Sequence, residues 1–402
     1  MLISINNILY ALADSLDCVE HELFGASNNH SRRVAYMAIS MGREFGLEDK
    51  QQLNLAASAV LHDNALTEYN RSELNRGLDV LSDKSAVNLK DHCIMGEENV
   101  STLPYFQEAK GAILYHHEEA DGTGPFGLTA EDTPLFSRLI HIADITDVAF
   151  DLGNMDYNKY RHVMNFVDGS RNSRFDDKVV DVFVRVCTYG ELCRMDDAYI
   201  DALLKNALPM IPVDYTNENL EGISSMFARI TDYKSSFTCS HSQGVADKVR
   251  KMARYYGCSD EETAKLYFAG ALHDIGKLKI ENDILEKPER LTSEEYAQIQ
   301  THAYATWEIL GGIDGIDDIR RWASLHHEKL NGSGYPFGKT GDDLDRNDRL
   351  MACVDIYQAL TESRPYKKGM SHEQVMEIMN QEVSRGTLDK NIVSDMDKCF
   401  GA

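Results

Sequence analysis

The sequence predicts an all-α protein made of two tandem helical bundles. Apolar residues recur at helical spacing between recognisable helix caps, and alternating strand patterns are scarce. The strongest observation is an internal repeat. Ten of the 14 histidines form two sets of five, displaced by 210 or 211 positions, as His241 is from His30. Chance does not keep register over such a distance, so we expect a duplicated domain.

The first bundle is expected to close with helices between residues 151 and 201. Pro209 and Pro212 then interrupt the helical pattern and polar residues follow, which is typical of a domain boundary. We therefore assign residues 1–207 to an N-terminal domain and residues 220–402 to a C-terminal domain.

Two helices near the start of the C-terminal domain are indicated by their ends. Val245 to Tyr256 has apolar residues at helical spacing and precedes Gly257, a favoured residue after a helix C-terminus. Ser259 and Glu262 then form a capping box, which predicts a helix leading to His273.

A further helix is expected to carry His302. Thr292 with Glu295 makes its capping box, and the pair Gly311-Gly312 marks its end. The repeated histidines therefore come from several helices of one bundle, which Gly-rich loops join.

The repeated histidines are accompanied by repeated aspartates, and together they form a ligand set for divalent metals. Imidazole and carboxylate groups suit iron, manganese and zinc, and an Asp after a His can bridge two ions with its two oxygens. The expected C-terminal ligands are His241, His273, Asp274, His302, His326, His327 and Asp355. The corresponding N-terminal set, a second candidate metal site, is His30, His62, Asp63, His92, His116, His117 and Asp144. The histidines outside the repeat are expected to be structural: His21, His141, His162 and His372.

The composition is that of a globular protein, with 43% hydrophobic and 26% charged residues in a chain of 402. No apolar run approaches the roughly 20 residues of a membrane span, and the first residues lack a signal-peptide pattern. We therefore expect a cytoplasmic protein with no membrane partner. The eight cysteines are scattered without paired-ligand spacing, which fits reduced structural thiols. The net charge of −24 argues against binding to duplex nucleic acid, although basic residues cluster between positions 329 and 368.

Several motifs accompany the C-terminal ligands. In chain order they are His273-Asp274-Ile275-Gly276-Lys277, His326-His327-Glu328, Asn331-Gly332-Ser333-Gly334-Tyr335-Pro336, Asp355 and Arg364-Pro365-Tyr366-Lys367. From about residue 237 to about residue 370 the second half thereby resembles the HD-GYP family of cyclic-dinucleotide phosphodiesterases. The first half resembles the same HD superfamily only in its metal positions.

The resemblance implies hydrolysis of a cyclic dinucleotide, cyclic di-GMP or 3′3′-cGAMP, to a linear dinucleotide by in-line attack of a metal-bridging hydroxide. It implies one metal on His241, His273, Asp274 and Asp355, and another on Asp274, His302, His326 and His327. The expected catalytic residues are Asp274, as the bridge, and Lys277, whose charge would stabilise the phosphoryl group in the transition state. The expected substrate-binding residues are Lys277, Tyr335, Arg364 and Lys367. Glu328 and Asn331 are expected to support the ligands or order the loop.

The number of metals is predicted from one departure from the family. Some members carry a Glu four residues before the first His ligand and hold three metals, whereas here that position is Phe237, and in the first half Ala26. Neither side chain can ligate a metal. We therefore expect two divalent ions in the C-terminal domain, with iron or manganese favoured, and treat the N-terminal set as a candidate for further metals.

The N-terminal domain lacks the substrate contacts that the resemblance implies. Leu66 replaces Lys277, Pro125-Phe126 replaces Tyr335-Pro336, and residues 153–155 replace the Arg364 motif. We expect this domain to regulate its neighbour or to organise a homodimer, the alternative being a relic site.

Two other function classes stay open for the chain. One is a phosphohydrolase of mononucleotides, against which Tyr335-Pro336 and Arg364 count. The other is a non-catalytic cyclic-dinucleotide receptor, which suits the first domain better than the second, because the second keeps every ligand and Lys277.

Overall fold

The computed structural model describes residues 28–66, 89–103, 106–209, 216–234, 240–287, 289–313, 315–363 and 368–401, with 13, 16–18, 21, 68 and 69. They fall into two compact units, one taking in the described residues up to 209 and the other those from 216 onward. Within these ranges the regular elements are helices, and β pairing is limited to isolated bridges between loop residues. The prediction of an all-α fold is confirmed.

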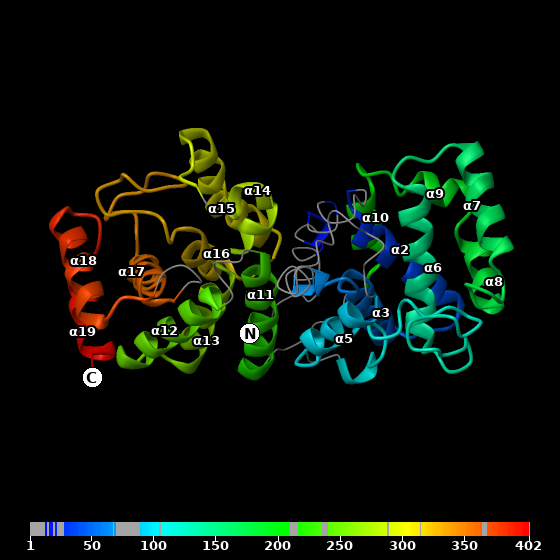
Figure 1. Cartoon of the computed structure of the whole chain (residues 1–402), viewed down its shortest axis with the longest axis horizontal. Helices are drawn as coiled ribbons and strands as arrows, with labels where there is room; N and C mark the ends of the chain where they lie inside the picture. The colour runs from blue at the N-terminus through cyan, green and yellow to red at the C-terminus, as the bar shows by residue number, and fades with distance from the viewer. Residues whose placement is uncertain are drawn as a thin grey trace. The chain divides into compact units, whose positions relative to one another are not determined.

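The N-terminal unit is a bundle around one central helix. Its elements are α2 (His30–Glu44), α3 (Asp49–Val60), α5 (Leu89–Val100), the 3₁₀ turn η2 (Phe106–Glu108), α6 (Leu135–Phe150), α7 (Tyr157–Gly169), α8 (Asp177–Val186), α9 (Tyr189–Cys193) and α10 (Ile200–Ala207). Helix α2 packs against α3, α6, α8 and α10 and is buried along most of its length. Helices α7 to α10 occupy the segment expected to close this domain (Figure 1).

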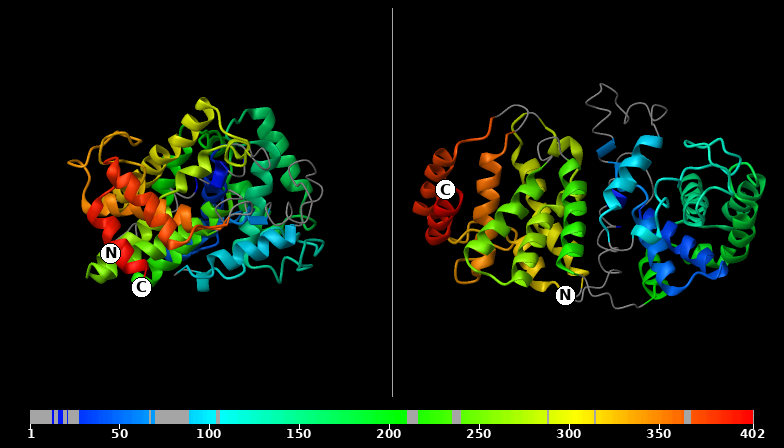
Figure 2. Two further views of the ribbon diagram at one scale, coloured as in Figure 1. Left: turned by 60° about the vertical axis from the view of Figure 1, so that its left-hand side comes forward. Right: turned by 90° about the horizontal axis from the view of Figure 1, so that it is seen from below.

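The C-terminal unit has the same kind of architecture. Its elements are α11 (Asn217–Lys234), α12 (His241–Tyr255), α13 (Asp260–Leu272), η3 (Ile275–Lys279), α14 (Asn282–Leu285), α15 (Ser293–Gly311), α16 (Asp317–Ser324), α17 (Arg346–Thr361), α18 (His372–Ser384) and α19 (Lys390–Phe400). Helix α13 is central and packs against α11, α12 and α16. Helices α18 and α19, red in Figures 1 and 2, pack together at one end of this unit.

Helix ends in this unit follow the local sequence signals. The Ser259 hydroxyl accepts a hydrogen bond from the backbone N–H of Glu262, and Thr292 forms a reciprocal capping box with Glu295. Helix α12 begins at His241, four residues before the apolar pattern that predicted it. Its first two residues, His241 and Ser242, are polar yet buried: His241 faces the metal-ligand cluster described below, and the backbone N–H of Ser242 donates to the Asp232 carboxylate at 3.0 Å.

A close backbone contact positions the turn that follows α13. Gly276 lies against α15, and a Cβ atom there would be 2.0 Å from the carbonyl oxygen of His302. The backbone N–H of Gly276 donates to Thr306 Oγ1 at 3.1 Å. This contact holds the start of η3 against the helix that carries His302.

Among the described residues, no helix has the length and apolar character that crossing a membrane requires.

Candidate metal centres

Asp274 lies at the centre of the C-terminal ligand cluster. Its Oδ2 atom is 3.3 Å from Nε2 of His273 and 3.9 Å from Nε2 of His241. Its Oδ1 atom is 3.4 Å from Nε2 of His302 and 3.9 Å from Nε2 of His326. The two oxygens thus face two different pairs of imidazoles, which is the arrangement of a carboxylate that bridges two ions.

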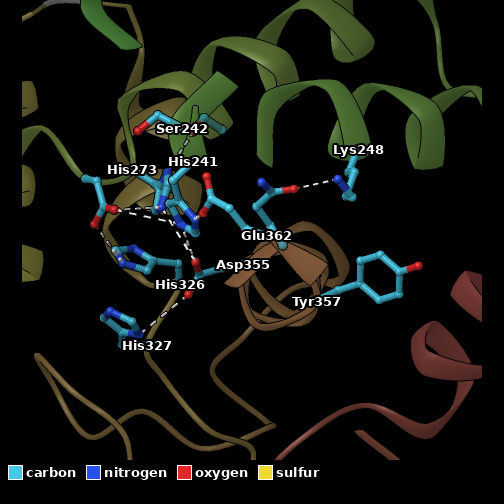
Figure 3. A network of polar contacts seen from close by, with 12 residues as sticks. His241, Ser242, Lys248, His273, His326, His327, Asp355, Tyr357 and Glu362 are labelled. Atoms are coloured by element: carbon cyan, nitrogen blue, oxygen red, sulfur yellow. Dashed lines mark hydrogen bonds and ion pairs between the residues drawn. The ribbon is translucent and has the colours of Figure 1, made fainter. Parts of the chain in front are cut away.

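Asp355 on α17 completes the cluster. Its Oδ1 atom is 3.0 Å from Nε2 of His241 and 3.7 Å from Nε2 of His273, and its Oδ2 atom is 3.9 Å from Nδ1 of His327. Figure 3 shows these side chains converging from α12, α17 and the turns after α13 and α16. The structure therefore brings all seven predicted C-terminal ligands together, six of them buried and His327 half-buried.

The hydrogen bonds of two imidazoles leave their Nε2 atoms facing each other across the cluster. Nδ1 of His302 and Nδ1 of His326 each donate to the carbonyl oxygen three residues earlier, both at 2.6 Å. Burial lowers the pKa of His302 to about 3 and holds the pKa of His326 well below its usual value. Both rings are therefore neutral, and their Nε2 lone pairs face each other at 3.3 Å. Two nitrogens bound tetrahedrally to one zinc-sized ion would be roughly 3.3 Å apart.

His273 shows the same pattern. Its Nδ1 donates to the Gly270 carbonyl at 2.7 Å, while its buried Nε2 has no hydrogen-bond partner among the described residues. A buried acceptor left without a partner is costly unless an ion or another donor satisfies it. Groups of His and Asp ligand atoms here lie within 4.8 Å of one another. The residues present fit divalent metal ions.

Glu362 supports the ligand His241 from behind. Its Oε2 atom lies 3.2 Å from His241 Nδ1, and its Oε1 atom accepts a hydrogen bond from the Ser240 hydroxyl at 3.1 Å. This contact fixes the ring so that Nε2 faces the cluster. Sequence analysis did not identify Glu362. The available signal was its position seven residues after Asp355, at the residue that caps the C-terminus of α17.

Lys277 lies beside the central aspartate. Its Nζ atom donates to Asp274 Oδ2 at 2.5 Å, and its side chain is 20% exposed. Burial raises the pKa of Asp274, but its contact with His273 and the charge of Lys277 outweigh this effect and hold that pKa well below its usual range. The central carboxylate is therefore ionised and able to bridge cations.

Tyr335 lies at the rim of the cluster. Its ring centroid is 4.7 Å from that of His327, and its backbone N–H donates to the His327 carbonyl at 3.2 Å. The carboxylate of Glu328 accepts backbone hydrogen bonds from Phe337 at 2.7 Å and Lys339 at 2.9 Å. Glu328 thus orders the loop that carries Tyr335.

Some predicted positions lie outside the described residues. These are the substrate-binding candidates Arg364 and Lys367, and the positions Phe237 and Ala26 from which two metals rather than three were expected.

The N-terminal unit has a cluster of the same design, centred on Asp63. The Asp63 Oδ1 atom is 3.4 Å from Nε2 of both His92 and His116, and its Oδ2 atom is 3.7 Å from Nε2 of His62. The two oxygens again face different imidazoles.

Asp144 on α6 completes the N-terminal cluster. Its Oδ1 atom is 3.4 Å from His30 Nε2, and its Oδ2 atom is 4.0 Å from His117 Nδ1. Behind His30, the carboxylate of Asp147 lies 2.7 Å from Nδ1 and also accepts hydrogen bonds from the buried guanidinium of Arg33. Asp147 was not predicted, although it follows Asp144 by one helical turn.

Cys93 also lies in the N-terminal cluster and was expected only to be structural. Its Sγ atom is 3.7 Å from Nε2 of His92 and 3.7 Å from Nδ1 of His116. The corresponding residue in the second half is Ala303. The sequence signal that could have identified Cys93 was this difference between the two halves at a position next to a predicted ligand.

Two histidines outside the repeat make ordinary structural contacts. His141 Nδ1 lies 2.9 Å from the His116 carbonyl, and His372 lies between the Tyr357 hydroxyl and Asp397, at 2.8 and 2.9 Å. These contacts are consistent with the structural role expected for both.

Two duplicated helical bundles, each with the same His and Asp cluster, define a protein of the HD domain type. The chain belongs to the HD domain family, which matches residues 19–179 and again residues 225–392. One match falls in each half, as the internal repeat predicted.

Named relatives extend the similarity over the whole chain. The chain is 31% identical over 400 residues to the 3′3′-cGAMP-specific phosphodiesterase 1 of Vibrio cholerae, covering 97% of this chain and 90% of that protein. A probable cyclic di-GMP phosphodiesterase of the same organism is 33% identical over 201 residues, covering 48% of this chain and 42% of that protein. The fold is similar to that in a crystal structure of a cyclic GMP-AMP-specific phosphodiesterase of V. cholerae. The TM-score is 0.68 at 23% identity, with 100% of this chain and 98% of that chain covered.

Proposed function

We propose that the chain is a metal-dependent phosphodiesterase that hydrolyses a cyclic dinucleotide to a linear dinucleotide at its C-terminal centre. The observation that carries the proposal is the position of Asp274, whose two carboxylate oxygens face two different pairs of imidazoles. The names of the relatives support the substrate class.

Two divalent ions held by the seven C-terminal ligands would polarise a water molecule and the phosphodiester oxygens. The ligands are five imidazoles and two carboxylates, which favours iron or manganese. Glu362 orients His241, and the backbone carbonyls behind His273, His302 and His326 fix the tautomer of each ring.

We assign the residues around the cluster to substrate binding and to stabilisation of its charge. Lys277 carries its charge beside Asp274, where it would stabilise the negative charge that develops on the phosphoryl group. Tyr335 presents an aromatic ring beside His327, in a position to stack on a nucleobase. Arg364 and Lys367 remain candidates for the phosphates, because a guanidinium can bind a phosphate through two hydrogen bonds.

Among cyclic dinucleotides, we favour 3′3′-cGAMP over cyclic di-GMP. The relative that matches 97% of the chain is named as specific for 3′3′-cGAMP, whereas the probable cyclic di-GMP phosphodiesterase matches 48% of it. Because the longer match includes both halves, it compares the whole duplicated architecture and not the C-terminal motifs alone.

For the N-terminal unit we propose metal binding without hydrolysis. Its ligand cluster repeats the C-terminal geometry, but the position of Lys277 is taken by the buried Leu66, and that of Tyr335 by Pro125. Without these groups the unit is left to regulate its neighbour or to organise a homodimer.

The test is hydrolysis by the pure protein, reduced and loaded with iron or manganese, of 3′3′-cGAMP, cyclic di-GMP and cyclic di-AMP, with the products separated by chromatography. We expect a linear dinucleotide, formed fastest from 3′3′-cGAMP. Binding of all three without product would favour a receptor, and turnover of mononucleotides alone would favour the phosphohydrolase alternative.

A further inference from the structure

The two metal clusters differ in the ligand atoms they offer. One N-terminal group of closely spaced ligand atoms consists of His92, Cys93, His116 and His117, whereas the C-terminal groups in the described part of the chain contain only His and Asp. Ala303 stands where the first half has Cys93. The N-terminal cluster therefore has a sulfur atom at a position where the C-terminal cluster has a methyl group.

The position of the sulfur fits coordination of an ion shared with His92. Cys93 is fully buried, and its Sγ atom lies 3.7 Å from Nε2 of His92. A thiolate and an imidazole bound tetrahedrally to one zinc ion, with bonds of about 2.3 and 2.0–2.1 Å, would be separated by roughly 3.5 Å. The observed separation needs only a small adjustment to reach this value.

The two rings beside the sulfur are incompletely hydrogen-bonded. Nδ1 of His92 is buried and has no hydrogen bond to any described residue, and Nε2 of His116 approaches Oδ1 of Asp63 only to 3.4 Å. In the C-terminal unit, the ring of His302 is anchored through Nδ1 to the Ile299 carbonyl, a contact that His92 does not make among the described residues. Buried polar atoms of this kind require an ion or another partner.

A hydrogen-bond donor is also in place for a sulfur ligand. Nδ1 of His116 donates to the Ile113 carbonyl at 2.6 Å and lies 3.7 Å from Cys93 Sγ. An N–H group shared between a carbonyl and a sulfur is a contact that stabilises a metal-bound thiolate. A buried free cysteine that serves only as a small apolar residue needs no ring nitrogens around it.

We propose that Cys93 is a metal ligand, together with His92 and His117, and that it makes the N-terminal centre a zinc site. Thiolate ligands favour zinc over the harder ions that suit an all-nitrogen and oxygen site. Three protein ligands leave the fourth position of a tetrahedral zinc site open, so the absence of hydrolysis proposed for this unit rests on the lack of a lysine at Leu66. The inference rests on metal binding by the N-terminal unit, proposed above, and not on which dinucleotide is hydrolysed.

The test uses cobalt as a spectroscopic substitute for zinc in the full-length chain. A His273→Ala, His326→Ala background restricts binding to the N-terminal centre. In this background we expect bound cobalt to show thiolate-to-cobalt charge-transfer absorption in the near ultraviolet. Cys93→Ala should remove that absorption, and Cys187→Ala, which changes another buried cysteine of the same unit, should leave it unchanged.

X-ray absorption at the zinc edge, measured on the zinc-bound protein with the same two histidine substitutions, provides a readout that needs no cysteine variant. A sulfur neighbour at about 2.3 Å supports the proposal, and a shell of nitrogen and oxygen alone overturns it. Charge-transfer absorption that persists in Cys93→Ser, a variant of nearly equal volume, also overturns it. Failure to bind any metal in this background would overturn both this inference and N-terminal metal binding. A loss of hydrolysis would concern the function proposed for the C-terminal centre and would not test the role of Cys93.

Discussion

The ammonium group of Lys277 lies 2.5 Å from Oδ2 of Asp274, the carboxylate oxygen that also faces His241 and His273. One oxygen of the central aspartate is thus shared between a lysine and one of the two imidazole pairs. The lysine side chain is 20% exposed and lies at the edge of the cluster, and its charge helps to keep Asp274 ionised.

Replacing Asp274 by Ala is expected to abolish hydrolysis, because it removes the carboxylate that would bridge the two ions. Metal content, measured by elemental analysis, should fall with activity. Asp342→Ala changes an exposed aspartate of the same unit and should leave both values near wild type. Near-normal turnover with full metal content in the Asp274 variant would refute a bridged pair of ions.

The double change His62→Ala with Asp63→Ala is expected to leave measurable phosphodiesterase activity. It dismantles the N-terminal cluster, which has Leu66 at the position of Lys277, the lysine proposed to act in catalysis. Turnover should be compared with circular dichroism of the same sample. Complete loss of activity in a folded protein would show that the N-terminal unit is catalytic or strictly required by its neighbour.

Glu362→Ala is expected to weaken metal binding at the C-terminal centre by roughly 10–100-fold, the usual effect of removing a carboxylate behind a histidine ligand. The contact concerned is the 3.2 Å approach of Glu362 Oε2 to His241 Nδ1. Turnover should recover when metal is saturating, which separates a positioning role from a catalytic one. Glu377→Ala, at an exposed site on α18, is the control. Unchanged metal affinity in the Glu362 variant would contradict the role given to it.

Gly276→Ala is expected to destabilise the C-terminal unit by about 1–3 kcal/mol, the usual range for overpacking. The new Cβ would lie 2.0 Å from the carbonyl oxygen of His302, which is backbone and cannot turn aside. Thermal unfolding should show the loss, accompanied by weaker metal binding. Gly312→Ala, where the nearest atom would be 3.7 Å away, should change little. Equal stability of the two variants would mean that η3 and α15 can separate without cost.

The structure brings together the residues that the sequence predicted as ligands, because a metal site requires particular residue types and the repeat identifies their positions twice. The sequence did not predict the residues behind them. The Nδ1 atom of His30 is paired with Asp147, but the equivalent position in the second half is Gln358, and Glu362 performs the task instead. Residues on neighbouring turns of a helix can orient a ring equally well. The residues that make these contacts therefore need not occupy equivalent positions in the two halves, so the repeat does not identify them. The close contact at Gly276 was hidden for a related reason, since its counterpart in the first half is Ala65.

Lys277→Leu separates the stabilisation of substrate charge from metal binding, and it installs the residue that the first unit already has at Leu66. Lys277 touches Asp274 but is not among the candidate metal ligands, so elemental analysis should find metal content near wild type. Turnover should fall by about 10²–10³, or roughly 3–4 kcal/mol, because a fixed charge beside the developing oxyanion is lost. Lys279→Leu, which changes an exposed lysine in the same 3₁₀ turn, should retain full activity. Unchanged turnover in the Lys277 variant would make this residue a surface lysine, and loss of the metals would make its role structural. Only a fall in turnover with the metals retained supports a catalytic role for its charge.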